Sequence, residues 1–297
     1  MEPLTLKLDA IAHWNSKIGE NTVSIPALQR GLVWKPKQIE LLWDSLMRGI
    51  PIGSFVICKA IEIQKKSEDD KAEYHLLDGQ QRVNAIQLGF DKFSSHEEML
   101  NPKKSILWLD IDPENLPKDS SRNFLFRVTT PAHPWGYTKG DAEGTLGARI
   151  VREWISNNLK KDTADIKYIR PRPEEMQPIE AKFPIPVSLL LNALENGAIN
   201  KEKLKNEVSI YKGTWVQNIL EKLNDSEFDL SNISKGIATA LNTTVLALQA
   251  PQELLASSRQ EADNDERPDI TNIEHLFQRL NQQGTKLDGE ELIYSLI

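Results

Sequence analysis

Residues 74–90, YHLLDGQQRVNAIQLGF, are the stretch from which the rest of the chain can be interpreted. The stretch opens with a short, largely apolar run that is typical of a buried strand. Asp78-Gly79 interrupts that run, because glycine adopts backbone angles that other residues avoid. From Gln80 onward, apolar residues recur at the spacing of a helix. The stretch therefore predicts a strand that passes through an Asp-Gly turn directly into a helix.

A strand, turn and helix in this order can bind an anion. The first amides of a helix precede its hydrogen-bond ladder and the helix dipole is positive there, so a phosphate or carboxylate can bind to them. Arg82, in the first turn, can add a forked, charge-assisted contact. We therefore predict a nucleotide-phosphate pocket made of Asp78, Gly79, Gln80, Gln81 and Arg82. The alternative is an ordinary N-cap at Asp78 and a surface charge at Arg82.

The composition is typical of a soluble globular protein, since 39% of the 297 residues are hydrophobic and 27% are charged. We find no apolar run of transmembrane length and no signal peptide, and the single cysteine, Cys58, suits a reducing compartment. We therefore expect a cytoplasmic protein with no membrane partner. The formal net charge of −7 argues against nucleic acid binding over the whole surface, but leaves open a local basic patch at Lys167, Arg170 and Arg172.

The pattern along the chain predicts an α+β protein. We expect an N-terminal α+β part, residues 1–135, and a mostly helical part, residues 136–297, that packs back on it. The chain stops inside a helical pattern at residues 287–297, so we expect that a longer protein continues beyond it. The predicted strands are residues 4–8, 50–57, 74–77, 106–111, 123–129 and 243–248. The predicted helices are residues 36–49, 80–90, 146–159, 186–194, 201–208, 214–223, 231–241 and 271–281.

Three segments together resemble one family. They are IPALQRGLVWKPKQIELLWDSLMRGIPIGSF at residues 25–55, LLDGQQRVNAI at residues 76–86 and FQRLNQQGTKLDGEEL at residues 277–292. In this order they resemble the N-terminal, GmrS-like domain of GmrSD-type modification-dependent restriction systems, a branch of the ParB/sulfiredoxin-like superfamily. The resemblance implies a ParB/sulfiredoxin-like α/β core in the N-terminal part. It also implies NTP binding and hydrolysis, coupled to DNA cleavage by a C-terminal HNH-type nuclease domain outside this chain.

The resemblance also assigns roles to residues. Relatives hold nucleotide phosphates with a Gly-x-x-Arg turn, which corresponds here to Gly79 and Arg82, with Asp78 as the acidic partner. Two departures limit what it implies: the turn lacks the cysteine that sulfiredoxin needs, and the chain has no H-N-H arrangement. The family string P-x-x-Q-R-x-x-x-W matches Gln29, Arg30 and Trp34, and the string F-x-R-L-N-x-x-G-T matches Phe277, Arg279, Asn281, Gly284 and Thr285.

Phosphoryl transfer requires neutralised phosphate charge and a positioned water. We predict that Arg82 and Arg30 supply the charge, and that Asp78 orients water or holds Mg²⁺. His133 is a candidate acid–base group near neutral pH, or else a structural residue of its Pro/Gly loop. The predicted catalytic set is Asp78, Gln81, Arg82 and His133, and the predicted nucleotide-binding set is Gly79, Gln80, Arg30, Gln29, Trp34 and Asn281.

Several alternatives stay open. Trp34 either stacks on the base or packs in the core, and Asn281 either reaches the nucleotide or caps a helix. Asp110 and Asp112 either share a metal ion or form a solvated strand end. The whole chain could instead be a DNA-sensing module without hydrolysis, as the basic patch and the aromatic loop at residues 133–137 suggest. A further alternative is that the chain is itself a nuclease that uses a metal ion at Asp78. The base, the DNA modification and the oligomeric state are not predicted.

Overall fold

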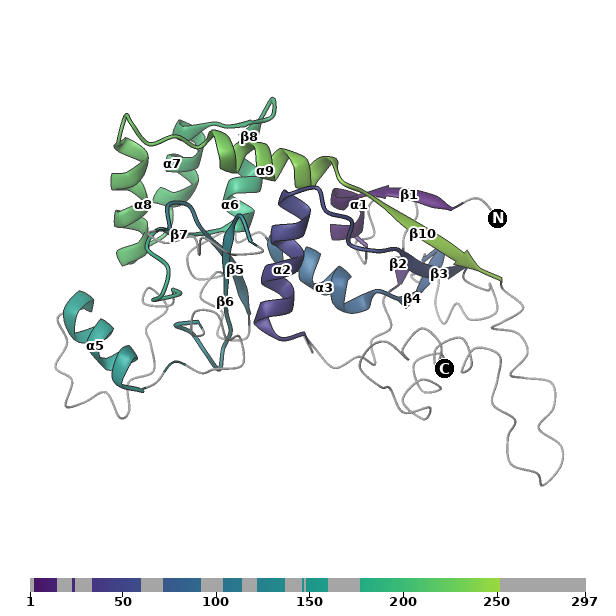
Figure 1. Ribbon diagram of the computed structural model, residues 1–297, viewed down its shortest axis with the longest axis horizontal. Coiled ribbons are helices and arrows are strands. Elements are labelled where there is room, and N and C mark those ends of the chain that lie inside the picture. Colours follow the sequence, from purple (N-terminus) through teal and green to yellow (C-terminus); the bar gives the residue numbers. More distant parts are fainter. Residues whose placement is uncertain are drawn as a thin grey trace, which may run out of the picture. The chain divides into compact units, whose positions relative to one another are not determined.

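The computed structural model describes residues 3–14, 23–24, 34–59, 72–91, 104–113, 122–136, 146, 148–159 and 177–251. They form helices, one mixed sheet and antiparallel strand pairs, so the predicted α+β class is confirmed (Figure 1). The chain divides into two compact units. The first unit comprises Met1–Val33, Gly53–Asn84 and Thr244–Ile297, and the second comprises Trp34–Ile52 and Ala85–Thr243. The boundary predicted at residue 135 and the ParB/sulfiredoxin-like core stay predictions.

The first unit is built on a five-stranded mixed sheet. Its order is β1 (Leu4–Lys7), β10 (Thr244–Ala250), β3 (Phe55–Lys59), β4 (Tyr74–Asp78) and β2 (Val23–Ser24). Strand β10 runs antiparallel to β1 and parallel to β3, and β4 runs antiparallel to β3. The sheet therefore places residues near the start of the chain beside residues near position 250 (Figure 1).

The predicted start of the strand at residues 50–57 is wrong, because β3 begins only at Phe55. Proline lacks a backbone N–H, and Gly53 has a φ of +86°, so Pro51 and Gly53 keep this segment out of the sheet. Phe55 is fully buried and meets the Trp14 ring edge-on, with 5.1 Å between the ring centroids. Cys58 on the same strand is also buried, which is usual for a thiol that packs as a small apolar side chain.

The predicted strand at residues 4–8 is confirmed as β1, and the short helix α1 (Leu8–Ala12) follows it. The strand predicted at residues 243–248 is confirmed as β10. Its Val245 and Ala247 are buried, whereas Leu246 and Leu248 are 48% and 46% exposed. This alternation is the period of a strand with one face toward the core.

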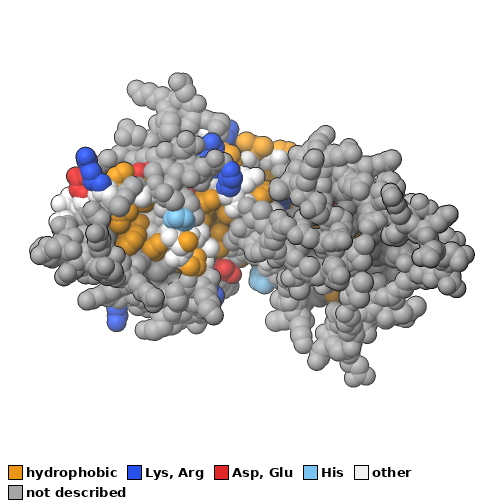
Figure 2. Space-filling view, turned by 90° about the horizontal axis from the view of Figure 1, so that it is seen from below, with side chains coloured by type: hydrophobic (Ala, Val, Ile, Leu, Met, Phe, Trp, Pro, Cys, Tyr) orange, Lys and Arg blue, Asp and Glu red, His pale blue; other side chains and the backbone are white. Residues whose placement is uncertain are grey.

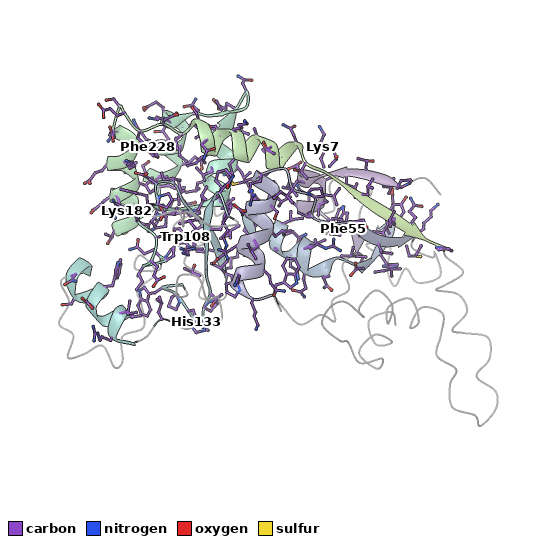
Figure 3. All side chains as sticks on the ribbon, viewed as in Figure 1. Lys7, Phe55, Trp108, His133, Lys182 and Phe228 are labelled. Atoms are coloured by element: carbon purple, nitrogen blue, oxygen red, sulfur yellow. The ribbon has the colours of Figure 1, made fainter. Side chains whose placement is uncertain are left out.

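The second unit contains a three-stranded antiparallel sheet, with β5 (Ile106–Asp110) between β6 (Leu125–Thr129) and β7 (Pro184–Pro186). The strands predicted at residues 106–111 and 123–129 are confirmed as β5 and β6, which pair with each other. Trp108 at its centre is fully buried (Figure 3). Its Nε1–H donates to the Thr129 hydroxyl at 2.9 Å, and its ring meets Trp215 edge-on at 5.4 Å. A buried indole thus has both its apolar ring and its donor satisfied.

The described residues also form several longer helices. Helix α2 begins with Pro36 at its first position, and Gly49 follows its end with a φ of +70°. The helices are α2 (Pro36–Met47), α3 (Gln80–Phe90), α5 (Ala148–Leu159), α6 (Val187–Ala193), α7 (Lys201–Ser209), α8 (Thr214–Asn224) and α9 (Ser231–Asn242). Of the described helices, none is long and apolar enough to cross a membrane.

Helices α2 and α3 approach closely at a glycine. A Cβ added to Gly89 would lie 2.0 Å from Cζ2 of Trp43 on α2. The Trp43 Nε1–H donates to the Ala85 carbonyl oxygen on α3 at 2.8 Å, which fixes the indole in this position. The close approach therefore depends on the missing side chain at position 89.

A short hairpin completes the second unit. It pairs β8 (Leu194–Glu195) with β9 (Ala198–Ile199) through Asn196-Gly197, whose φ angles are +51° and +81°. Two left-handed residues of this type form the preferred two-residue hairpin turn.

Candidate functional site

The predicted strand, turn and helix are confirmed. Strand β4 ends at Asp78, Gly79 has a φ of +102°, and helix α3 begins at Gln80. The Val83 N–H donates to the Gly79 carbonyl oxygen at 3.0 Å, which starts the helical ladder. The amides before Val83 precede that ladder, and these are the groups to which an anion binds at a helix N-terminus.

Two separate constraints require glycine at position 79. Its φ lies in the left-handed region, which L side chains rarely adopt. In addition, a Cβ at this position would lie 2.3 Å from Cδ1 of Phe55, a fully buried ring. The backbone of the turn therefore passes directly over the Phe55 ring.

Arg82 is held inside this turn. Its Nη2 lies 3.1 Å from Oδ2 of Asp78, and its Cζ lies 5.1 Å from the centroid of the Phe55 ring. The Arg82 side chain is only 17% exposed, whereas that of Asp78 is 35% exposed. The alternative that Arg82 is a solvated surface charge is therefore wrong.

The electrostatics of the turn follow from this burial. Burial lowers the pKa of the Arg82 guanidinium from its ordinary value, and the Asp78 carboxylate opposes that effect. A guanidinium nevertheless stays charged in proteins. Among the described residues, the site therefore holds a partly buried cation with the Asp78 carboxylate beside it, an arrangement of the kind that attracts an oxyanion.

Gly53 and Phe55 belong to this site and were missed by the sequence analysis. A Cβ added to Gly53 would lie 2.6 Å from Nη1 of Arg82. The sequence does contain a Pro-x-Gly-x-Phe string there, but nothing in it indicates contact with a residue in a distant segment. Pairing of β3 with β4 is what brings the two segments together.

The other predicted site residues fall into three groups. Gln80 and Gln81 lie in the first turn of α3 and are half-buried. Trp34 and His133 belong to the second unit, so the structure does not place them in the turn. Outside the described residues lie Gln29, Arg30 and Asn281, as do Lys167, Arg170 and Arg172 of the predicted basic patch.

His133 shapes a tight turn through its backbone. Its N–H donates to the Thr130 carbonyl oxygen at 3.0 Å, and its own carbonyl oxygen accepts from the N–H groups of Thr130 and Gly136 at 3.2 and 3.0 Å. The residue as a whole is half-buried. These contacts account for a structural role of the His133 backbone, while its acid–base role stays a prediction.

In the described part of the chain, no three His, Cys, Asp or Glu side chains gather as a metal site. Asp78 is thus the single carboxylate of the turn that a metal ion could use. Mg²⁺ is commonly bound by one or two carboxylates together with substrate phosphates. The turn therefore fits a Mg²⁺ ion that arrives with a nucleotide better than one bound by the protein alone.

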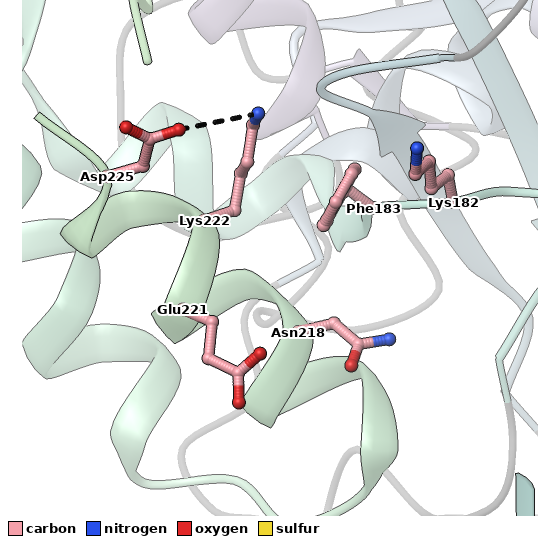
Figure 4. A pocket seen from close by; sticks show the side chains of 6 residues that line it. All are labelled: Lys182, Phe183, Asn218, Glu221, Lys222 and Asp225. Carbon is pink, nitrogen blue, oxygen red and sulfur yellow. Dashed lines mark ion pairs between the residues drawn. The ribbon is translucent and has the colours of Figure 1, made fainter. Parts of the chain in front are cut away.

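A pocket of about 440 Å³ lies in the second unit (Figure 4). Its Lys222 is already neutralised, because Nζ lies 2.7 Å from Oδ2 of Asp112 and 3.9 Å from Oδ2 of Asp225. With Glu221 nearby, the pocket offers no excess positive charge to a phosphate. The residues that line it are Lys182, Phe183, Asn218, Glu221, Lys222 and Asp225.

Asp110, close to this pocket, has a structural role. It is buried, and its carboxylate accepts from the backbone N–H groups of Lys182 and Phe183 at 2.8 and 3.0 Å. The expectation of a solvated strand end is therefore wrong for Asp110.

The second unit also contains a buried charge cluster. Oε2 of Glu40 on α2 lies 3.0 Å from Nη1 of Arg122 and 4.0 Å from Nη1 of Arg127. Burial raises the pKa of Glu40, and the two arginines act in the opposite direction.

On the face shown in Figure 2, basic and acidic side chains both border hydrophobic ones, and no broad field of one charge covers the described residues.

The chain is similar to a known protein family. Residues 11–297 match the family model described as "GmrSD restriction endonuclease, N-terminal domain". No curated protein matches the chain. The matched range covers nearly all of the sequence and includes the Asp78–Arg82 turn.

Proposed function

Because the chain belongs to the family of GmrSD restriction endonuclease N-terminal domains, we propose that it binds and hydrolyses a nucleoside triphosphate. In this proposal it regulates a modification-dependent restriction system of anti-phage defence. DNA cleavage is then carried out by a domain outside this chain. The observation that supports the proposal most strongly is the partly buried Arg82 guanidinium at the junction of β4 and α3.

The turn offers the chemical groups that bind a triphosphate. Arg82 would neutralise phosphate charge, and the first amides of α3 would donate to phosphate oxygens. Gln80 and Gln81, half-buried at the same helix start, would hold phosphate or water. Asp78 would orient the attacking water or hold Mg²⁺, and a bound Mg²⁺ neutralises charge that develops on the phosphate oxygens.

Other predicted residues extend this proposal. Arg30 and Gln29 would add to the phosphate contacts, Trp34 and Asn281 would contact the rest of the nucleotide, and His133 would transfer a proton. Each of these roles can be tested by alanine substitution once nucleotide binding has been measured.

Isothermal titration calorimetry with ATP and GTP tests the proposal on the whole chain. A charge-assisted contact contributes about 1.5–3 kcal/mol, so Arg82→Ala should weaken binding about 10- to 150-fold. Arg48→Ala is a matched control, because Arg48 also pairs with an aspartate four residues earlier, Asp44, at 3.1 Å. If wild type and Arg82→Ala bind nucleotide with equal affinity, the turn is not the phosphate-binding site.

The rival function, DNA sensing without hydrolysis, makes a different prediction. Binding that depends on phosphate neutralisation falls steeply with salt concentration. Duplex binding with that salt dependence, in a protein that neither binds nor hydrolyses ATP or GTP, would favour the rival. Nucleotide turnover by a protein that does not bind DNA would exclude it.

A further inference from the structure

The Arg82 guanidinium lies between two positions at which a side chain is missing. A Cβ on Gly53 would lie 2.6 Å from Nη1, and a Cβ on Gly79 would lie 3.2 Å from Nη2. The Phe55 ring lies on another side, with its centroid 5.1 Å from Cζ. We name this surrounding, made by Gly53, Gly79 and Phe55, the glycine slot.

We propose that Gly53 is a positioning residue for Arg82, which it serves by leaving room for the guanidinium in the glycine slot. This inference rests on the proposed function of Arg82 as the phosphate contact. Gly53 reaches Arg82 from the segment before β3, whereas Gly79 belongs to the turn itself. The slot thus ties the orientation of Arg82 to the loop before β3 as well as to the helix start.

The physical basis is the entropy of a long side chain. Arginine has several rotatable bonds, and a free arginine loses that freedom when it binds a ligand. A guanidinium that is already held over Phe55 and beside Asp78 has lost much of it before the ligand arrives. Its planar fork is then presented in one orientation, which suits two parallel hydrogen bonds to a phosphate.

The slot also predicts what an added methyl group would do. At Gly53 the nearest atom is Nη1, the far end of a flexible side chain, so the guanidinium moves and the fold is retained. At Gly79 the nearest atoms belong to the buried Phe55 ring, so the same change would disturb the core. Gly53→Ala is therefore the informative variant.

Gly197→Ala is the matched control for Gly53→Ala. Gly197 has a φ of +81°, close to the +86° of Gly53, so alanine meets a similar backbone strain at both positions. A Cβ on Gly197, however, would have no atom within 4 Å. The difference between the two variants therefore reports the contact with Arg82.

Two measurements test the slot. The first is the ¹⁵N NMR signal of Arg82 Nε in the ligand-free protein, which should shift in Gly53→Ala and stay in place in Gly197→Ala. The second is titration with ATP and GTP. Ordering one long side chain weakens binding about two- to twelvefold, which is the loss expected in Gly53→Ala. In an Arg82→Ala background, Gly53→Ala should cause no additional loss.

The outcomes separate this inference from the proposed function. If wild type binds neither nucleotide, the proposed function fails, and the Arg82 signal alone still tests the slot. The proposed role of Gly53 would be refuted by an unchanged Arg82 signal in Gly53→Ala. It would also be refuted if Gly53→Ala lost the same affinity in the wild-type and Arg82→Ala backgrounds. Should Gly53→Ala not fold, the heteronuclear NOE of Arg82 Nε in wild type replaces it: a value like that of the rigid backbone supports the slot, and a value typical of a mobile side chain refutes it.

Discussion

Replacing Asp78 by asparagine separates two effects that this carboxylate has in the proposed site. Asp78 pairs with Arg82 at 3.1 Å, so it competes with an incoming phosphate for the guanidinium. It is also the carboxylate that would hold Mg²⁺ beside that phosphate. The first effect opposes nucleotide binding and the second favours it, so the sign of the change depends on the metal ion.

The magnitude follows from the exposure of the pair. With 35% of the Asp78 side chain and 17% of the Arg82 side chain open to solvent, the pair contributes about 0.3–1 kcal/mol net, less than a buried pair. Without divalent metal, Asp78→Asn should therefore bind ATP or GTP about two- to fivefold more tightly than wild type. With Mg²⁺ present, the same variant should bind more weakly, because it has lost the metal ligand.

Titration of both proteins in EDTA and in Mg²⁺ gives the four dissociation constants that are needed. Glu202→Gln is a suitable control, since Glu202 forms an exposed pair with Lys205 at 2.7 Å and its substitution changes the net charge equally. Urea unfolding should show a loss of no more than about 1 kcal/mol in Asp78→Asn. Weaker binding by the same factor in EDTA and in Mg²⁺ would refute the competition between Asp78 and the phosphate.

Two further predictions concern stability. Gly89→Ala should gain about 1 kcal/mol of helix propensity but lose about 1–3 kcal/mol through overpacking against Trp43. Urea unfolding should therefore show a lower free energy of unfolding than in wild type. A higher free energy of unfolding would mean that the two helices separate easily. Burial raises the pKa of Glu40 in the folded protein above the ordinary value of 4.5. The stabilisation linked to protonated Glu40 is therefore fully present below pH 4.5 and is lost as the pH rises through the raised pKa. The difference in unfolding free energy between wild type and Glu40→Gln should therefore fall as pH rises from 4.5, and a rising difference would contradict the assigned direction.

The sequence was sufficient where structure depends on neighbours along the chain. The Asp-Gly break, the helix after it and the helix that begins at Pro36 all follow from backbone preferences and periodicity. These signals act over a few residues, so a single sequence contains them in full. The turn that carries Arg82 was predicted for this reason.

Contacts between distant segments could not be predicted in the same way. Asp110 was expected at a solvated strand end, but its carboxylate accepts hydrogen bonds from the backbone of Lys182 and Phe183. Strand β10 was recognised as a strand, yet its place between β1 and β3 depends on pairing that no local pattern specifies. Gly53 was missed for the same reason, since its partner becomes visible only once β3 and β4 are paired.

The environment of Arg82 meets two demands that conflict in a simple ion pair. A fully exposed pair with Asp78 would be weak and would leave the guanidinium without a fixed orientation. A fully buried pair would fix it, but several kcal/mol would be needed to break it when a ligand arrives. Here Gly53, Gly79 and Phe55, which are uncharged, contribute to the orientation, while the counter-charge comes from a partly exposed carboxylate. If a phosphate replaces Asp78 as proposed, these uncharged neighbours stay in contact with the guanidinium, which should then keep its place. The two substitutions Gly53→Ala and Asp78→Asn should therefore change nucleotide affinity in EDTA in opposite directions.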